Sequence, residues 1–188
     1  MKKVFILTWP SWVGKTTLWE QLKSKVPNIE KVITTTTRKK RDYEKHWKDY
    51  YFVTIDEFTK LIKEGKLIEY AEVHNNFYGS TYDELERILN LWKTPLYIVD
   101  PQGVKFLKTK LSWLYDVKTI FILPPSENEL KKRLLKRGED KNSESFKVRL
   151  NESLIWLSEK DNYDYQIVND DLEKAVGKLS EILNYFFK

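Results

Sequence analysis

Residues 9–17 carry the residue types and spacing of a phosphate-binding loop. Such a loop needs a glycine, four further residues and then Gly-Lys-Ser/Thr, placed between a strand and a helix. Its backbone N–H groups surround phosphate, its lysine reaches the β- and γ-phosphates, and its hydroxyl binds Mg²⁺. Gly14, Lys15 and Thr16 supply the last three elements, whereas Trp9 stands at the first glycine position. Because Gly-Lys-Thr before a helix also occurs by chance, this half-motif alone does not decide between a phosphate-binding loop and a chance match.

Four apolar runs alternate with helical patterns, and they predict the elements that position this loop. The expected strands are residues 3–8, 95–99, 119–123 and 165–168, and the expected helices are residues 15–25, from 102 onward, from after 125 to 137, and 172–187. Strands that alternate with helices indicate an α/β fold with a parallel sheet covered on both faces. The runs are nearly all apolar, as expected for strands that are buried on both sides.

Two segments interrupt this alternation. Residues 33–83 contain consecutive threonines, a basic cluster and several tyrosines, and we interpret them as an inserted lobe that binds substrate. Residues 127–150 are expected to form a lid, in which the polar stretch 138–146 suits a mobile flap. No repeat, low-complexity tract or linker divides the chain, so the sequence predicts one domain. Its core would comprise residues 1–32, 84–126 and 151–188.

The composition excludes several classes of protein. With 188 residues, 41% hydrophobic and 32% charged, the chain is not wholly disordered. No stretch approaches the roughly 18 consecutive apolar residues that span a membrane, and the apolar run 4–7 is too short for a secretory signal. Without cysteine there is neither a disulfide nor thiolate chemistry. The net charge of +5 favours an anionic partner, and the isolated His46 and His74 are expected at the surface.

Beyond the loop, a series of motifs in fixed order resembles the guanylate kinase family over nearly the whole chain. The family loop reads Gly-Pro-Ser-Gly-x-Gly-Lys-Ser/Thr, and its signature Thr-Thr-Arg-x-x-Arg-x-x-Glu-x-x-Gly-x-x-Tyr-x-Phe corresponds to residues 36–52. The further matches are Glu69-Tyr70-Ala71-Glu72-Val73, Asn76-Phe77-Tyr78-Gly79-Ser80, Asp100-Pro101-Gln102-Gly103, Arg133-Leu134-x-x-Arg137-Gly138, Arg149-Leu150 and residues 163–171. The resemblance implies a P-loop nucleoside monophosphate kinase fold and phosphoryl transfer from ATP to GMP, with Mg²⁺ as cofactor.

On the ATP side, the resemblance implies that the phosphate loop and one distant asparagine bind the nucleotide. These residues are Trp9, Pro10, Ser11, Trp12, Val13, Gly14, Lys15, Thr16, Thr17 and Asn169. Lys15 would contact the β- and γ-phosphates, and Thr16 with Asp100 would bind Mg²⁺. An aspartate after a buried strand can also be only a helix N-cap.

The resemblance further assigns arginines to catalysis. Arg133, Arg137 and Arg149 of the lid would stabilise the charge on the transferred phosphoryl group. The alternative for Arg133 and Arg137 is ordinary charge on a helix surface. The expected catalytic residues are the three lid arginines together with Lys15 and Arg38.

On the GMP side, the resemblance implies that Arg38, Arg41, Tyr50 and Tyr78 hold the acceptor phosphate. The planar fork of arginine suits this role because it binds phosphate bidentately. The base would be recognised by Thr34, Glu69 and Ser80, with the Glu69 carboxylate accepting hydrogen bonds from guanine N1–H and the exocyclic amine. Without the surrounding motifs, residues 38–41 would indicate a solvated basic loop or a nucleic-acid patch.

Tryptophan is enriched in this chain and glycine is depleted. There are seven tryptophans and six glycines, where the usual ~7% glycine would give ~13. Trp9, Trp12, Trp47 and Trp92 stand at family glycine positions, and we hypothesise that UGA codons for glycine are written here as tryptophan. Engineered replacement and a decayed enzyme are the alternatives. We expect the chain as written to fold but to bind ATP poorly, because glycine accepts φ > 0 and allows close approach to phosphate.

Two other functions stay open on the sequence. A catalytically inactive guanylate-kinase-like module could hold phosphorylated partners, and a basic chain rich in aromatics could bind nucleic acid. Lys15, Thr16, Asp100 and the lid arginines favour the enzyme, although Ile98 replaces an acid that the family usually carries. We therefore expect a cytoplasmic enzyme, monomeric or homodimeric, with ATP and GMP as small-molecule substrates and no nucleic-acid or membrane partner.

Overall fold

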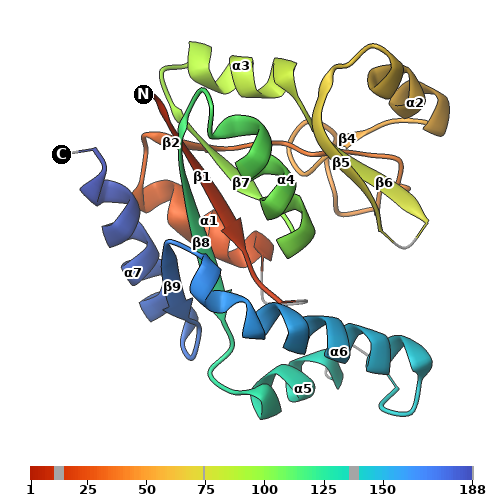
Figure 1. Cartoon of the computed structure of the whole chain (residues 1–188), viewed down its shortest axis with the longest axis vertical. Helices are drawn as coiled ribbons and strands as arrows, with labels where there is room; N and C mark the ends of the chain where they lie inside the picture. The colour runs from red at the N-terminus through yellow and green to blue at the C-terminus, as the bar shows by residue number, and fades with distance from the viewer. Residues whose placement is uncertain (11–14, 74, 136–139, 188) are drawn as a thin grey trace.

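A five-stranded parallel sheet, ordered β2-β7-β1-β8-β9, forms the centre of the protein (Figure 1). The computed structural model describes residues 1–10, 15–73, 75–135 and 140–187, with the backbone alone at 15 and 16. The strands are β1 (Lys3–Thr8), β2 (Ile29–Lys31), β7 (Thr94–Ile98), β8 (Asp116–Leu123) and β9 (Tyr165–Val168). They pair in parallel, which confirms the predicted fold class.

Helices cover both faces of this sheet because β1 carries apolar side chains on both sides. Phe5 and Leu7 pack with residues of α1 and α7, whereas Val4 and Ile6 pack with residues of α3 and α4. All four of these β1 side chains are fully buried. The helices are α1 (Lys15–Lys25), α3 (Tyr82–Asn90), α4 (Pro101–Leu111) and α7 (Leu172–Tyr185). The buried β1 therefore gives the loop that follows it a rigid base.

A second sheet, ordered β4-β3-β6-β5, lies to one side of the first (Figure 1). Its strands are β3 (Thr35–Thr36), β4 (Tyr51–Phe52), β5 (Leu67–Val73) and β6 (Asn76–Thr81). Helix α2 (Ile55–Lys63) packs on it through Phe58, which is fully buried and stacks on Phe77 at 5.4 Å between ring centres. This sheet lies within residues 33–83, for which the sequence predicts a substrate-binding lobe.

Two helices, α5 (Glu127–Leu135) and α6 (Glu144–Ser158), pack against each other beyond the end of β1 (Figure 1). They share a small apolar cluster of Leu130, Leu134 and Phe146, and α6 is followed by the short 3₁₀ helix η1 (Lys160–Asn162). The predicted flap is wrong at residues 144–146, which form the first turn of α6. Ser143 caps this helix by accepting from the backbone N–H of Phe146 at 3.1 Å, and the buried Phe146 ring anchors it. Residues 138 and 139 lie outside the described part of the chain.

The apolar runs and the helical patterns of the sequence predicted their elements well. The observed bounds of β1, α1 and β9 are the predicted ones. Helices α2, α3 and α6 and the short strands of the second sheet were not predicted. Across the described ranges, no helix combines the length and apolar character that crossing a membrane requires.

Candidate functional site

The carboxyl end of β1 leads directly into the predicted phosphate loop. Thr8 ends the strand, Pro10 is buried, and α1 begins at Lys15, with Thr17 exposed in its first turn. Ligands of parallel α/β sheets bind beyond the carboxyl ends of the strands, and a helix N-terminus favours phosphate there. Predictions for the loop residues Ser11, Trp12, Val13 and Gly14, and for the side chains of Lys15 and Thr16, lie outside the described part of the chain.

Trp9 is the loop residue whose side chain the structure does describe. It is 2% exposed and belongs to the apolar cluster that contains Leu18 and Leu22 of α1. The indole thus packs inside the protein.

Asp100 lies beside the loop because β7, which precedes it, is the neighbour of β1. The backbone N–H of Val99 donates to the carbonyl of Leu7 at 3.2 Å. Asp100 Oδ1 accepts a hydrogen bond from the backbone N–H of Gly103 at 2.8 Å and caps helix α4. The N-cap interpretation is therefore confirmed. The second oxygen, Oδ2, accepts none of the hydrogen bonds found among the described residues, so it can serve another ligand.

Arg38, Tyr50 and Tyr78 lie together on the second sheet. The Arg38 guanidinium is 5.4 Å from the Tyr50 ring centre, and the Tyr50 and Tyr78 ring centres are 6.1 Å apart. Burial raises the pKa of the Tyr50 hydroxyl, which keeps its proton available as a hydrogen-bond donor. The three side chains can offer a guanidinium and two hydroxyls to one anion.

Glu44 links the two arginines that the sequence assigns to the acceptor phosphate. Its Oε1 accepts from Nη2 of Arg38 at 2.6 Å, and its Oε2 accepts from the backbone N–H of Arg41 at 2.9 Å. The Arg41 side chain is exposed and donates to the Tyr43 hydroxyl at 2.9 Å. Burial opposes the charge of Glu44, but the hydrogen bonds from Arg38 and Arg41 lower its pKa below the ordinary value. Sequence reasoning gave this glutamate no role, although its place in the signature was a signal.

Glu69 of β5 and Ser80 of β6 face each other across an antiparallel pair. The Ser80 hydroxyl donates to Oε1 of Glu69 at 2.8 Å inside the protein. A Cβ at Gly79 would come within 2.8 Å of the Glu69 carbonyl, so this close approach requires glycine. Burial is the main reason that the pKa of Glu69 is raised to about 7; the hydrogen bond from Ser80 opposes the rise and the charge of Asp100 contributes to it. Thr34, half-buried just before β3, makes none of the described hydrogen bonds to this pair.

Arg133 and Asn169 meet, although 36 residues separate them in the chain. Nη2 of Arg133 donates to the Asn169 carbonyl at 3.1 Å, and its Nε donates to Oε1 of Glu129 at 3.0 Å. Asn169 is buried at the end of β9. Arg149 lies in α6, and Arg137 lies outside the described residues. The structure therefore brings together Asn169, which the resemblance assigns to ATP binding, and Arg133, which it assigns to catalysis.

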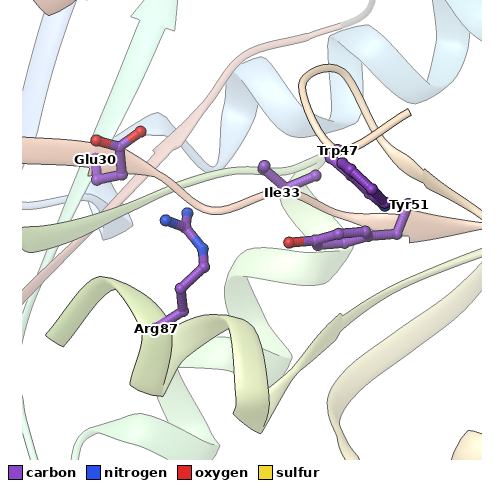
Figure 2. A pocket seen from close by; sticks show the side chains of 5 residues that line it. All are labelled: Glu30, Ile33, Trp47, Tyr51 and Arg87. Atoms are coloured by element: carbon purple, nitrogen blue, oxygen red, sulfur yellow. The ribbon is translucent and has the colours of Figure 1, made fainter. Parts of the chain in front are cut away.

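A cavity of about 430 Å³ is lined by a different set of residues (Figure 2). It is lined by Glu30, Ile33, Trp47, Tyr51 and Arg87. The buried Glu84 beside it accepts hydrogen bonds from the Arg87 guanidinium and the Tyr51 hydroxyl. Glu84 also accepts from the backbone N–H of Ile33 at 3.0 Å. Because these polar groups already have protein partners, we assign Glu84 to structure, where it ties the start of the second sheet to α3.

A metal ion would have few protein ligands here. Among the described residues, no group of three or more histidines and acids could hold one. Mg²⁺ is usually bound through one or two carboxylates together with substrate phosphates and water, and the single carboxylate of Asp100 fits that arrangement. His46 is exposed, as expected, and accepts from the backbone N–H of Phe52 at 3.1 Å, whereas His74 lies outside the described residues.

Comparison with known proteins gives a consistent result. The family model described as guanylate kinase matches residues 1–185. The guanylate kinase of Wolbachia pipientis wMel is 41% identical over 185 residues, which cover 96% of this chain and 89% of the relative. A crystal structure of guanylate kinase from Anaplasma phagocytophilum superposes with a TM-score of 0.77 at 34% identity, over 98% of this chain and 85% of that one. Shikimate kinase from Bacteroides thetaiotaomicron, with a TM-score of 0.52 and 17% identity over 97% of this chain and 98% of that one, shares the fold alone.

Proposed function

The chain belongs to the guanylate kinase family, whose reaction is phosphoryl transfer from ATP to GMP, and we propose that its two sheets hold the two substrates. ATP would bind at the carboxyl end of β1, and GMP would bind on the second sheet. Phosphoryl transfer demands that the protein position both groups and neutralise charge, without a covalent intermediate. Closure of the lid, residues 127–150, over the lobe, residues 33–83, would bring the phosphates together and exclude water.

The buried carboxylate of Glu69 is the observation that carries the assignment of guanine. Among the described residues, Ser80 is the side chain that donates to it, and a buried carboxylate is costly unless further donors reach it. Guanine supplies two such donors, N1–H and the exocyclic amine, whereas adenine has no N1–H. Ser80 and Thr34 would complete the contacts with the base.

The GMP phosphate would be bound by Arg38, Arg41, Tyr50 and Tyr78. The cluster of Arg38 with the two tyrosine rings supports this proposal, since all three present donors from one part of the second sheet. Arg41 is exposed and would turn from Tyr43 toward the phosphate.

The ATP phosphates would be surrounded by the backbone of residues 9–17 and contacted by Lys15. Asn169 would lie beside the adenine, and its hydrogen bond with Arg133 supports a site that joins β9 to α5. Arg133, Arg137 and Arg149 would stabilise the charge that develops on the transferred group.

The family is one of phosphotransferases that generally use a divalent metal, and we propose Mg²⁺ for this chain. Asp100 and Thr16 would hold it together with the ATP phosphates. The ion would supply positive charge to the phosphate oxygens. The Oδ2 atom of Asp100 supports this role, because Oδ1 is committed to the helix cap.

We also propose that the chain as written is impaired at the phosphate loop by Trp9 and Trp12. Trp9 would act through its packing against α1. Trp12 would act because a loop that approaches phosphate closely favours glycine at such positions. A cytoplasmic location and a monomeric or homodimeric state complete the proposal.

Calorimetric titration with GMP, IMP and AMP tests the assignment of guanine. IMP lacks the 2-amino group of guanine, and AMP lacks both this group and N1–H. We therefore expect affinity to fall in the order GMP, IMP, AMP. Glu69→Gln should weaken GMP binding by roughly 10- to 100-fold, because an amide cannot accept both guanine donors as a carboxylate does. Glu72→Gln, an exposed acid on the same strand, is the control and should bind GMP normally. Equal affinity for GMP and AMP would contradict the proposal.

A further inference from the structure

The Arg38 side chain is held on three sides. Its Nη2 donates to Glu44, and its Nη1 donates to the carbonyl of Lys39 at 2.8 Å. Its Cζ atom lies 5.4 Å from the ring centre of Tyr50 and 5.6 Å from that of Phe52. Each Nη nitrogen keeps one further N–H, so the guanidinium retains donors for a phosphate.

Glu44 is 7% exposed, although it lies in the irregular segment between β3 and β4. A buried carboxylate is tolerated only where its oxygens have partners. Both oxygens have partners here, the Arg38 side chain and the Arg41 backbone, and the backbone N–H of Glu44 donates back to the Arg41 carbonyl at 3.0 Å. These hydrogen bonds therefore hold Arg38, at the start of the loop 38–44, and its middle residue, Arg41, to Glu44.

We propose that Glu44 is the positioning residue of the acceptor phosphate site. It fixes the fork of Arg38 and holds the backbone of Arg41, so that both arginines reach one phosphate. This inference rests on the proposed function. It predicts that Glu44 affects the phosphate of GMP, while binding of the base and of ATP does not depend on it.

The test compares GMP with guanosine, which has the base but no phosphate, by calorimetric titration. Glu44→Gln removes the charge and should weaken GMP binding by roughly 10- to 100-fold, the factor expected for one charge-assisted hydrogen bond. Guanosine binding should stay unchanged. Glu44→Asp keeps the charge on a shorter side chain, so its GMP affinity should lie between those of the unsubstituted chain and of Glu44→Gln. Glu64→Gln, an exposed acid of the same lobe, should behave like the parent chain.

Three results would overturn the inference. Unchanged GMP affinity in Glu44→Gln removes its basis, and so does an equal loss of GMP and guanosine binding, which indicates a merely structural role. If Glu44→Gln does not fold, the GMP and guanosine affinities of the folded Glu44→Asp are compared in the same way. Failure of the proposed function shows separately, as absence of GMP binding by the unsubstituted chain, and it overturns both.

A second inference comes from the backbone at two tryptophans. Among the described residues other than glycine, three have left-handed φ: Trp47 at 70°, Asn75 at 60° and Trp92 at 58°. Asparagine adopts this conformation with some frequency, whereas bulky residues rarely do. Trp47 and Trp92 are therefore strained where glycine would not be.

Helices α2 and α3 end in the same hydrogen-bonded motif, one with glycine and one with tryptophan. After α2, Gly65 donates to the Ile62 carbonyl and the next residue donates to the Leu61 carbonyl. After α3, Trp92 donates to the Leu89 carbonyl and the next residue donates to the Ile88 carbonyl. This is the Schellman cap, whose left-handed residue is usually glycine, and the φ values of 64° and 58° agree.

Packing does not offset the strain at these positions. The side chain of Trp92 is 92% exposed and that of Trp47 is 70% exposed. Trp19 and Trp156 differ, since they lie inside α1 and α6, where glycine would weaken the helix.

We infer that positions 47 and 92 are glycine in the natural polypeptide, as translation of UGA as glycine would make them. Peptide mass spectrometry of the protein purified from the organism that encodes it should find glycine in the peptides that span both positions. Tryptophan in either peptide overturns the inference.

Thermal unfolding of the chain as written tests the backbone argument independently. Trp92→Gly should raise the Tm by about 2–4 °C. Gly65→Trp should lower it, since it creates the same strain at the end of α2. The matched control is Trp113→Gly, because Trp113 is 86% exposed without left-handed φ, and its Tm should not rise. A Tm unchanged or lowered by Trp92→Gly contradicts the inference.

Discussion

Glu69 is the side chain whose chemistry depends most on its surroundings. On the surface it would be an ordinary carboxylate, but burial raises its pKa to about 7. Near neutral pH it is thus poised between a neutral acid and a carboxylate, and only the carboxylate can accept from both guanine donors. The motif in the sequence identified Glu69 and Ser80, whereas the pKa follows from burial that no local pattern encodes.

This raised pKa predicts how stability varies with pH. Between pH 4.5, the ordinary pKa, and about 7, folded Glu69 keeps a proton that the unfolded chain has lost. The free energy of unfolding should therefore decrease as pH rises through this window, by up to about 3 kcal/mol. Urea unfolding at several pH values measures the slope. Glu69→Gln should flatten it, whereas Glu72→Gln should not, and a slope that survives Glu69→Gln would refute the assignment.

Two Thr-x-x-Glu sequences show why the same local motif does not predict the same hydrogen-bond partners for its glutamate. Thr54 and Glu57 form a complete capping box at the start of α2. At the start of α3, Thr81 caps the helix, but Glu84 turns instead to Arg87, Tyr51 and the backbone of Ile33. The difference is made by partners more than 30 residues away in the chain.

At the scale of elements, helix α4 depends on a residue to which we also assign chemistry. Asp100 caps α4, and asparagine caps helices about as well as aspartate. In the chain that carries glycine at positions 9, 12, 47 and 92, Asp100→Asn should therefore keep the Tm of its parent while Mg²⁺-dependent phosphoryl transfer falls, because the metal would lose a charged ligand. Asp100→Ala should lose about 1 kcal/mol of stability as well as activity. Full activity in Asp100→Asn would show that the cap is its whole role.

The elements that sequence predicted correctly are those with continuous apolar runs. The runs of β1 and β9 specify buried strands without help from distant residues. Strands β3 and β4 have two residues each and exist only because their neighbours pair with them, so no local pattern predicts them. The start of α6 was missed because polar residues surround its one anchor, Phe146.

At the scale of the whole molecule, the two sheets bring their candidate sites within electrostatic reach. The charge of Asp100, at the end of β7, contributes to the raised pKa of Glu69 in β5, and α4 packs against β5. A protein that transfers a group between two nucleotides needs this proximity. The resemblance predicted both sites, but only the fold determines their separation.

The most direct test of the central claim is GMP-dependent ADP release from Mg·ATP, measured for two chains side by side. One is the chain as written, and the other carries glycine at positions 9, 12, 47 and 92. We predict rapid, GMP-dependent release by the glycine chain and little or none by the chain as written. Absence of activity in both would contradict the account and leave a phosphate-binding module, while equal activity in both would show that the phosphate loop works with tryptophan.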